Sequence, residues 1–192
     1  SLLIAGAGGG REVLALCRTG YDIDGFECNP DLVEQANELL KKEGFNLNIQ
    51  LVPPDQCPDS INIYDGLIIG WAVYMHIQGR EKRISFLKKL RSQTREHAPI
   101  LLSFFSRTES SLYFRVVAEI GNGIRRILGR DYLEVGDDLA HVHGFNIYVH
   151  CFTKKEINFE LDQGGFQLDF CCTDVYGHAV GIASKLSDKI SI

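Results

Sequence analysis

Short runs of apolar residues alternate with segments of helical spacing over the first 105 positions of the chain. The apolar runs predict strands over residues 2–5, 22–27, 47–52, 64–70 and 100–105. Between them, apolar residues recur every three or four positions and predict helices over residues 11–18, 30–42 and 80–96. Strands that alternate with helices in this way indicate right-handed crossovers and a parallel sheet.

The alternation stops after residue 105 and resumes at residue 146. In between, apolar residues at helical spacing predict one helix over about residues 110–128, and a polar stretch over residues 129–144 follows it. We interpret residues 106–144 as an insertion within a single domain that spans residues 1–192, because a chain of this length suits one domain of ~150 residues with an insertion.

The C-terminal part contains one more strand and helix and then a strand pair. The strand is predicted over residues 146–152, and the helix begins with a capping box formed by Thr153 and Glu156. The last two strands, over residues 166–173 and 178–184, are separated by a link short enough for a hairpin. A hairpin places one antiparallel strand in the otherwise parallel sheet.

The predicted fold class is therefore α/β, a doubly wound, Rossmann-like sheet with helices on both faces. We expect the mostly parallel, seven-stranded sheet of this fold class, with one antiparallel strand from the C-terminal hairpin. Residue 1 falls at the start of a core strand, so we expect this domain to be N-terminally incomplete and the natural chain to extend further upstream.

Composition is typical of a folded protein, with 45% hydrophobic and 23% charged residues. The net charge of -5 gives no support to nucleic-acid binding, and no apolar run approaches the ~18 residues of a membrane span. None of the six cysteines forms a CxxC motif, and no Cys/His cluster has zinc-site spacing, so we predict no metal site. Reduced thiols in apolar segments favour a cytoplasmic protein.

Residues suited to binding follow each of the first five predicted strands, and ligands of open α/β sheets bind beyond the carboxyl ends of the strands. These residues are the glycine loop over residues 6–10, Glu27, Asp55, Trp71 and the segment 103–107. Because carboxyl ends of parallel strands meet at one edge of the sheet, five separate segments are predicted to deliver groups to one site.

The glycine loop and Glu27 together predict an adenosine site. The loop lets a ligand approach bare backbone, and Glu27, 17 residues after Gly10, is placed to accept both hydroxyls of a ribose. The alternatives are an ordinary glycine-rich turn and a carboxylate favoured by a helix N-terminus. Arg11 replaces the third glycine of a dinucleotide fingerprint, and no GK[ST] follows as in a P-loop.

The remaining pattern resembles class I S-adenosylmethionine-dependent methyltransferases over most of the chain. Its segments, in order, are LLIAGAGGGREVLAL, GFECNP, PPDQCPD, YDGLIIGWAVYMHI and HCFTKKEINFELDQGGF. One position departs from the family, whose members usually carry an acidic residue two positions before the first glycine, where this chain has Ile4. In the family, that acid helps to hold the methionine ammonium of the cofactor.

The resemblance implies S-adenosylmethionine as cofactor and ten residues that bind it: Gly6, Ala7, Gly8, Gly10, Glu27, Cys28, Asp55, Gln56, Gly70 and Trp71. The loop residues would line its methionine and ribose side, and Glu27 would hold the ribose hydroxyls. Cys28 would pack on adenine, and Asp55, beside Gln56, would accept a hydrogen bond from the adenine amino group. Gly70 and Trp71 would face the sulfonium. Asp55 as a turn residue and Trp71 as a core aromatic residue are the alternatives.

Methyl transfer from a sulfonium is an in-line displacement that needs a nearby nucleophile, exclusion of water and, for some acceptors, a base. The candidates for this base are Tyr74, His76, His141 and His143, each of which has a structural role as its alternative. We interpret residues 106–144 as a lid over the acceptor, although a helix that only covers the sheet edge is the alternative.

We therefore expect a methyltransferase that acts on a small molecule. A nucleic-acid substrate is disfavoured because WAVY, not an NPPY-type tetrapeptide, follows the fourth strand. The alternatives are a non-catalytic methyltransferase-like module, which Ile4 favours, and NAD-linked redox or aminopropyl transfer on the same fold. The sequence predicts neither the acceptor nor the oligomeric state, and it gives no sign of a membrane partner.

Overall fold

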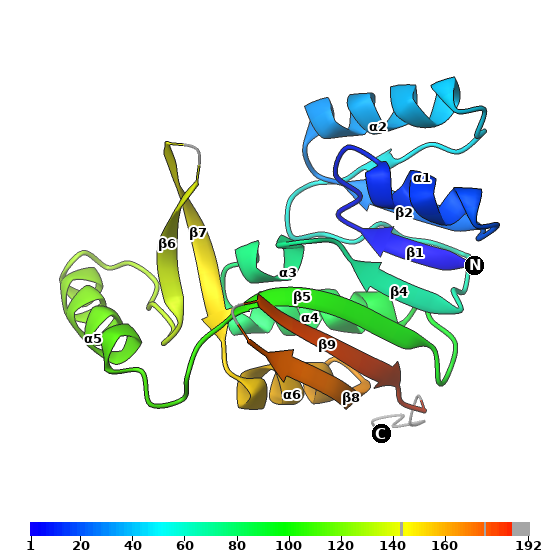
Figure 1. Cartoon of the computed structure of the whole chain (residues 1–192). Coiled ribbons are helices and arrows are strands. Elements are labelled where there is room, and N and C mark those ends of the chain that lie inside the picture. Colours follow the sequence, from blue (N-terminus) through cyan, green and yellow to red (C-terminus); the bar gives the residue numbers. More distant parts are fainter. Residues whose placement is uncertain (143, 175, 186–192) are drawn as a thin grey trace.

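A mixed sheet forms the body of the molecule in the computed structural model, which describes residues 1–142, 144–174 and 176–185 (Figure 1). Its strands are β1 (Leu2–Ala5), β2 (Ile23–Glu27), β3 (Gln50–Leu51), β4 (Gly66–Ile69), β5 (Pro99–Ser106), β8 (Phe166–Thr173) and β9 (Tyr176–Ala183). They lie in the order β3-β2-β1-β4-β5-β9-β8, in which β9 is antiparallel to both neighbours and the other pairs are parallel. The predicted fold class is confirmed, including the antiparallel strand from the C-terminal hairpin. The predicted number of seven strands is wrong, because two further strands, Asp137–Val142 and Phe145–Phe152, join the end of β5 and make a sheet of nine.

Helices cover both faces of the sheet because the side chains of each strand alternate between them. Ile4 of β1 packs in one buried cluster with α1 (Arg11–Arg18) and α2 (Pro30–Lys42). Leu3 and Ala5 point the other way, into a larger cluster with α3 (Val73–His76), α4 (Arg80–Arg91) and α6 (Lys154–Gln163). Figure 1 shows α4 and α6 behind β5, β8 and β9.

The predicted helix boundaries follow local chemistry. Asn29 caps α2 by accepting a hydrogen bond from the Asp31 backbone N–H at 2.9 Å. At the start of α6, the capping box is formed, because the Thr153 hydroxyl and the Glu156 carboxylate each bind the other residue's backbone N–H.

Helix α4 is shorter than the prediction of residues 80–96. Its regular hydrogen bonding ends near Arg91, where the hydroxyls of Ser92 and Thr94 bond to carbonyls one turn earlier, at 2.7 and 2.6 Å. Short polar side chains that bond to nearby backbone compete with a helix in this way.

The insertion contains more structure than the sequence predicted. Its helix α5 (Leu112–Ile127) agrees with the prediction, but the polar stretch over residues 129–144 includes the strand β6 (Asp137–Val142). β6 pairs antiparallel with β7 (Phe145–Phe152), whose last residues pair with the end of β5. In Figure 1 this two-stranded ribbon rises from the end of β5, and α5 lies on its outer side. We call residues 112–152, which contain α5 and this ribbon, the lid segment, after the role that the sequence predicts for residues 106–144.

None of the helices in residues 1–142, 144–174 and 176–185 is long and apolar enough to cross a membrane.

Candidate functional site

A cavity of about 440 Å³ lies beyond the carboxyl ends of the central strands. It is lined in part by seven of the ten predicted cofactor residues: Gly6, Gly8, Glu27, Cys28, Asp55, Gln56 and Trp71. The strand order explains this convergence. The glycine loop follows β1, Glu27 ends the neighbouring β2, and Trp71 follows β4 on the other side of β1. The cavity therefore forms where the sequence predicted a binding site.

The glycines of the loop are required by backbone conformation and by close packing. Gly6, Gly8 and Gly10 have positive φ angles of 76°, 53° and 83°. A Cβ atom on Gly6 would lie 2.1 Å from the Val73 side chain, and one on Gly70 would lie 2.1 Å from the Gly6 carbonyl oxygen. The loop thus packs directly on the end of β4, where only glycine fits.

Three predicted cofactor residues lie outside the cavity lining, namely Ala7, Gly10 and Gly70. Ala7 is buried among core residues, and a Cβ atom on Gly10 would lie 3.0 Å from the Ala36 side chain. These three residues pack the loop against its neighbours, and their role in cofactor binding stays a prediction.

Glu27 connects the loop to the start of α2 through a buried carboxylate. Its Oε2 accepts the Gly8 N–H at 2.9 Å, and its Oε1 accepts the N–H groups of Cys28 and Asn29 at 2.8 and 3.0 Å. A carboxylate offers about four acceptor positions, so these three bonds leave about one position on Oε2 for a hydroxyl of a ligand. Glu27 therefore does bind the backbone at the start of α2, as the alternative interpretation expected. It also keeps one free acceptor position at the cavity.

Asp55 lies at the same cavity in a strained conformation, with φ of 60°, although it is not a glycine. Lys82 lies 3.8 Å from its carboxylate, and the Gln56 N–H closes a turn onto the Pro53 carbonyl at 3.3 Å. Pro54 suits the second position of this turn and Asp55, with its positive φ, occupies the third, from which it lines the cavity beyond β3.

Among the candidate bases, His76 lines the cavity. Its Nδ1 lies 2.7 Å from the Tyr148 carbonyl oxygen. A carbonyl oxygen only accepts, so Nδ1 carries the proton, and in a neutral ring the Nε2 lone pair is free to accept a proton. This bond also joins α3 to the lid segment.

Tyr74 does not reach the cavity. It is buried, and its hydroxyl donates to Glu160 Oε2 at 2.6 Å. Burial, together with the charge of Glu160, raises the pKa of Tyr74 well above its usual value. Its prediction as a base is corrected, because this hydroxyl has neither access to a substrate nor a tendency to ionise.

Of the other two candidate bases, His141 belongs to the ribbon of the lid segment. His141 is exposed on β6, with Nδ1 3.1 Å from the Asn146 side-chain oxygen, and it does not line the cavity. His143 lies outside the described residues.

A buried network of charged side chains between α3, α4 and α6 was not predicted from the sequence. Arg83 and Glu160 are both fully buried, and their side chains form two parallel hydrogen bonds of 2.9 and 2.7 Å. Arg83 also donates to Glu134 at 2.6 Å, and the Tyr74 hydroxyl completes the contacts of Glu160. Burial alone opposes the charge of Arg83, but the bonds and charges of Glu160 and Glu134 outweigh it and raise its pKa. The network ties α3, α4, α6 and the lid segment together.

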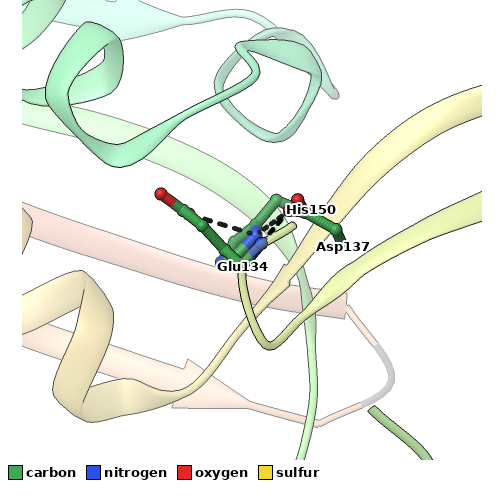
Figure 2. Close-up of side chains that lie close together, drawn as sticks. All are labelled: Glu134, Asp137 and His150. Carbon is green, nitrogen blue, oxygen red and sulfur yellow. Dashed lines mark hydrogen bonds and ion pairs between the residues drawn. The ribbon is translucent and has the colours of Figure 1, made fainter. Parts of the chain in front are cut away.

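The network continues into a second cluster, shown in Figure 2. His150 is fully buried, with Nδ1 2.7 Å from an Asp137 carboxylate oxygen and 3.7 Å from a Glu134 carboxylate oxygen. Three groups of metal-ligand type thus lie within 4.8 Å of one another. The Glu134 oxygen that faces His150 also accepts from the Arg83 guanidinium, which would repel a metal ion, so we interpret the cluster as part of the hydrogen-bonded network.

These carboxylates predict a loss of stability in acid. Burial opposes ionisation of Glu134 and Asp137, but Arg83 and His150 respectively outweigh it and lower both pKa values from 4.5 and 3.8. The unfolded chain therefore binds protons first, so their stabilisation is complete above about pH 5 and is lost as the pH falls through the lowered values. Thermal unfolding between pH 7 and pH 3 should show a falling Tm, with a shallower fall in Glu134→Gln. Asp131→Asn, which changes an exposed carboxylate, should show the same fall in Tm as wild type. If the Tm of Glu134→Gln fell with pH as steeply as that of wild type, the Glu134 carboxylate would not be a source of the acid sensitivity.

No protein-family model and no curated protein sequence matches the chain. Solved structures do. A S-adenosylmethionine-dependent methyltransferase from Methanosarcina mazei has a TM-score of 0.75 at 18% identity, with 95% of this chain and 92% of that chain covered. The 1,6-didemethyltoxoflavin-N1-methyltransferase of Burkholderia thailandensis has a TM-score of 0.66 at 14% identity, with 95% and 70% covered. The magnesium protoporphyrin IX methyltransferase of Synechocystis has a TM-score of 0.63 at 17% identity, with 95% and 74% covered.

These likenesses extend over nearly the whole chain and agree with the strand order, the glycine loop and the cavity at the carboxyl ends of the strands. The chain therefore has the fold of the class I S-adenosylmethionine-dependent methyltransferases, the family that its motifs resemble.

Proposed function

We propose that this chain binds S-adenosylmethionine in the cavity and transfers its methyl group to a small-molecule acceptor. The observation that carries the proposal is the hydrogen bond between Gly8 N–H and Glu27, which joins the glycine loop and the carboxylate at one cavity. The loop supplies room for a ligand against bare backbone, and the carboxylate retains an acceptor position for a ribose hydroxyl. The Burkholderia and Synechocystis structures, which contain S-adenosylhomocysteine, support the same choice of cofactor.

The adenine would lie toward β3, where Cys28, Asp55 and Gln56 line the cavity. The Asp55 carboxylate would accept a hydrogen bond from the adenine amino group. Its ion pair with Lys82 would limit the rotation of this carboxylate. The sulfonium would lie toward the end of β4, beside Trp71. Transfer requires only that the acceptor atom is held in line with the methyl group and that water is excluded.

His76 is the base that we propose for acceptors that must lose a proton, because Nε2 is free and its ring lines the cavity beside Trp71. His141 and His143 stay predictions that depend on movement of the lid segment, which we propose closes over the acceptor. The acceptors named for the two neighbours, didemethyltoxoflavin and magnesium protoporphyrin IX, support a small molecule as the acceptor of this chain. The six cysteines, all free thiols, support the proposed cytoplasmic location.

Calorimetric titration with four ligands tests the proposal. We expect S-adenosylmethionine and S-adenosylhomocysteine to bind with roughly micromolar affinity, and NAD and decarboxylated S-adenosylmethionine to bind at least about tenfold more weakly. His76→Asn should bind S-adenosylhomocysteine like wild type, because we propose that the His76 ring contacts the methyl acceptor and not the cofactor. Preferred binding of NAD or of the decarboxylated cofactor would indicate redox chemistry or aminopropyl transfer.

A non-catalytic module is the second candidate, and one observation favours it. Ile4 lies where the family usually carries an acid, and it is buried against α1 and α2, so no carboxylate stands at this position to hold an ammonium. If the titrations detected binding of neither S-adenosylmethionine nor S-adenosylhomocysteine, the non-catalytic module would be favoured over the enzyme.

A further inference from the structure

Three aromatic side chains lie in mutual contact at the carboxyl edge of the sheet, beside the cavity. Trp71 follows β4, Phe105 is near the end of β5, and Tyr176 is the first residue of β9. The ring centroids of Trp71 and Tyr176 are 5.0 Å apart, those of Phe105 and Tyr176 are 5.7 Å apart, and those of Trp71 and Phe105 are 6.4 Å apart. We call these three residues the aromatic platform.

Two of the three platform residues belong to the sheet, and Trp71 lies in the turn between β4 and α3. Phe105 and Tyr176 are cross-strand partners in the antiparallel pair β5–β9, so their side chains lie side by side on one face. Trp71 meets both rings edge to face, at interplanar angles of 73° and 71°. Such contacts are favourable beyond the area they bury, and they hold the rings in place before a ligand arrives.

The platform nevertheless remains open to solvent. Trp71 is 54% exposed and Tyr176 is 50% exposed, whereas Phe105 is half-buried and packs against the core. Large aromatic side chains that gather on a surface without being covered mark a binding site more often than single exposed residues do. The expected alternative for Trp71, an ordinary core aromatic residue, is inconsistent with this exposure.

The platform begins where the cofactor cavity ends. Trp71 lines the cavity, and the next residue, Ala72, also lines it and has a positive φ of 69°. This conformation is unfavourable for any residue except glycine, and such strain gathers at functional sites. The strained turn joins the proposed sulfonium end of the cavity to the three rings.

We propose that the acceptor is a planar aromatic molecule that stacks on Trp71, Phe105 and Tyr176 with its reacting atom toward the cavity. This inference rests on the proposed function, since the cofactor defines which end of the cavity delivers the methyl group. The three side chains bear no formal charge and have flat faces and edges, so they favour a flat ring over a saturated ring of equal size or a charged, flexible acceptor. The geometry makes Trp71 and Tyr176 specificity-determining residues.

A matched pair of ligands tests the class of acceptor. With S-adenosylhomocysteine saturating the full chain, calorimetry should show that 2-naphthol binds at least about tenfold more tightly than its saturated counterpart, decahydro-2-naphthol. Trp71 is the only tryptophan of the chain, so its fluorescence should change saturably as 2-naphthol binds.

Substitutions locate the site. Tyr176→Ala should weaken 2-naphthol binding by about tenfold, and Tyr176→Phe should retain it, because the ring and not the hydroxyl makes the contacts. Tyr21→Ala removes an equally exposed tyrosine that is 53% accessible and lies before β2, and it should have no effect. Circular dichroism and binding of S-adenosylhomocysteine should be unchanged in all three variants.

The outcomes separate the two proposals. Equal affinity for the flat and the saturated ring, or unchanged binding in Tyr176→Ala, would overturn the aromatic acceptor while S-adenosylhomocysteine still binds. Failure of S-adenosylhomocysteine to bind would overturn the proposed function, and the inference with it.

Discussion

Replacing Glu27 by alanine should weaken binding of S-adenosylhomocysteine by about 100-fold, as measured by calorimetry. Hydrogen bonds to a charged group contribute roughly 1.5–3 kcal/mol each, and the loss of the ribose hydroxyl contact and of the ordered glycine loop together corresponds to this factor. The carboxylate is also the acceptor for the N–H groups of Gly8, Cys28 and Asn29, so the free energy of unfolding should fall by about 1–3 kcal/mol.

Two further variants separate binding from folding. Asp31→Ala removes an exposed carboxylate in the first turn of α2, outside the cavity, and should bind like wild type. Glu27→Gln keeps the shape and one acceptor oxygen, so it should fall between wild type and Glu27→Ala. If a folded Glu27→Ala bound S-adenosylhomocysteine within threefold of wild type, the ribose would not lie at Glu27.

The sequence alone predicted the body of the fold because its signal is local. Each core strand is a short apolar run, and each flanking helix repeats its apolar residues every three or four positions, as in α2. The residues at the carboxyl ends of these strands could be placed together because parallel strands bring those ends to one edge. The cavity, with Glu27 and the glycine loop, follows from that rule.

The side of a short helix to which each side chain points could not be predicted from the sequence. Tyr74 and His76 are two positions apart in α3, so their side chains point to different sides of the helix. His76 lines the cavity and Tyr74 faces the buried network. The strand β6 was missed for a related reason, since a ribbon that projects from the body lacks a strict alternation of buried and exposed positions, and the sequence DDLAHV reads as polar.

The buried network could not be predicted because its partners are far apart in the sequence. Arg83 lies 77 positions from Glu160 and 51 from Glu134. Helix α6 does contain an indication of the buried network. Glu160 interrupts the apolar face of α6 between Ile157 and Leu161, and a charge at a buried helical position indicates a partner, although it does not identify one.

Replacing Arg83 by alanine should lower the free energy of unfolding by about 3–5 kcal/mol, because the buried carboxylate of Glu160 loses its paired charge. For a domain of this size the loss corresponds to a fall in Tm of roughly 6–20 °C. Thermal and denaturant unfolding measure it. Arg95→Ala, which removes an exposed ion pair with Asp65, should leave the Tm within error of wild type.

The origin of this loss is tested by removing both charges. Arg83→Met combined with Glu160→Leu removes both charges of the fully buried pair, and apolar replacements of buried ion pairs are often well tolerated. Arg80 keeps its ion pair with Glu156, and the Glu134 carboxylate keeps the hydrogen bond from the Arg80 backbone N–H. The double variant should therefore be more stable than Arg83→Ala, and the two substitutions should be strongly non-additive in a double-mutant cycle. If the double variant were as unstable as the sum of the single variants, the contribution of Arg83 would come from packing against Phe152, over whose ring it lies, and not from its charge.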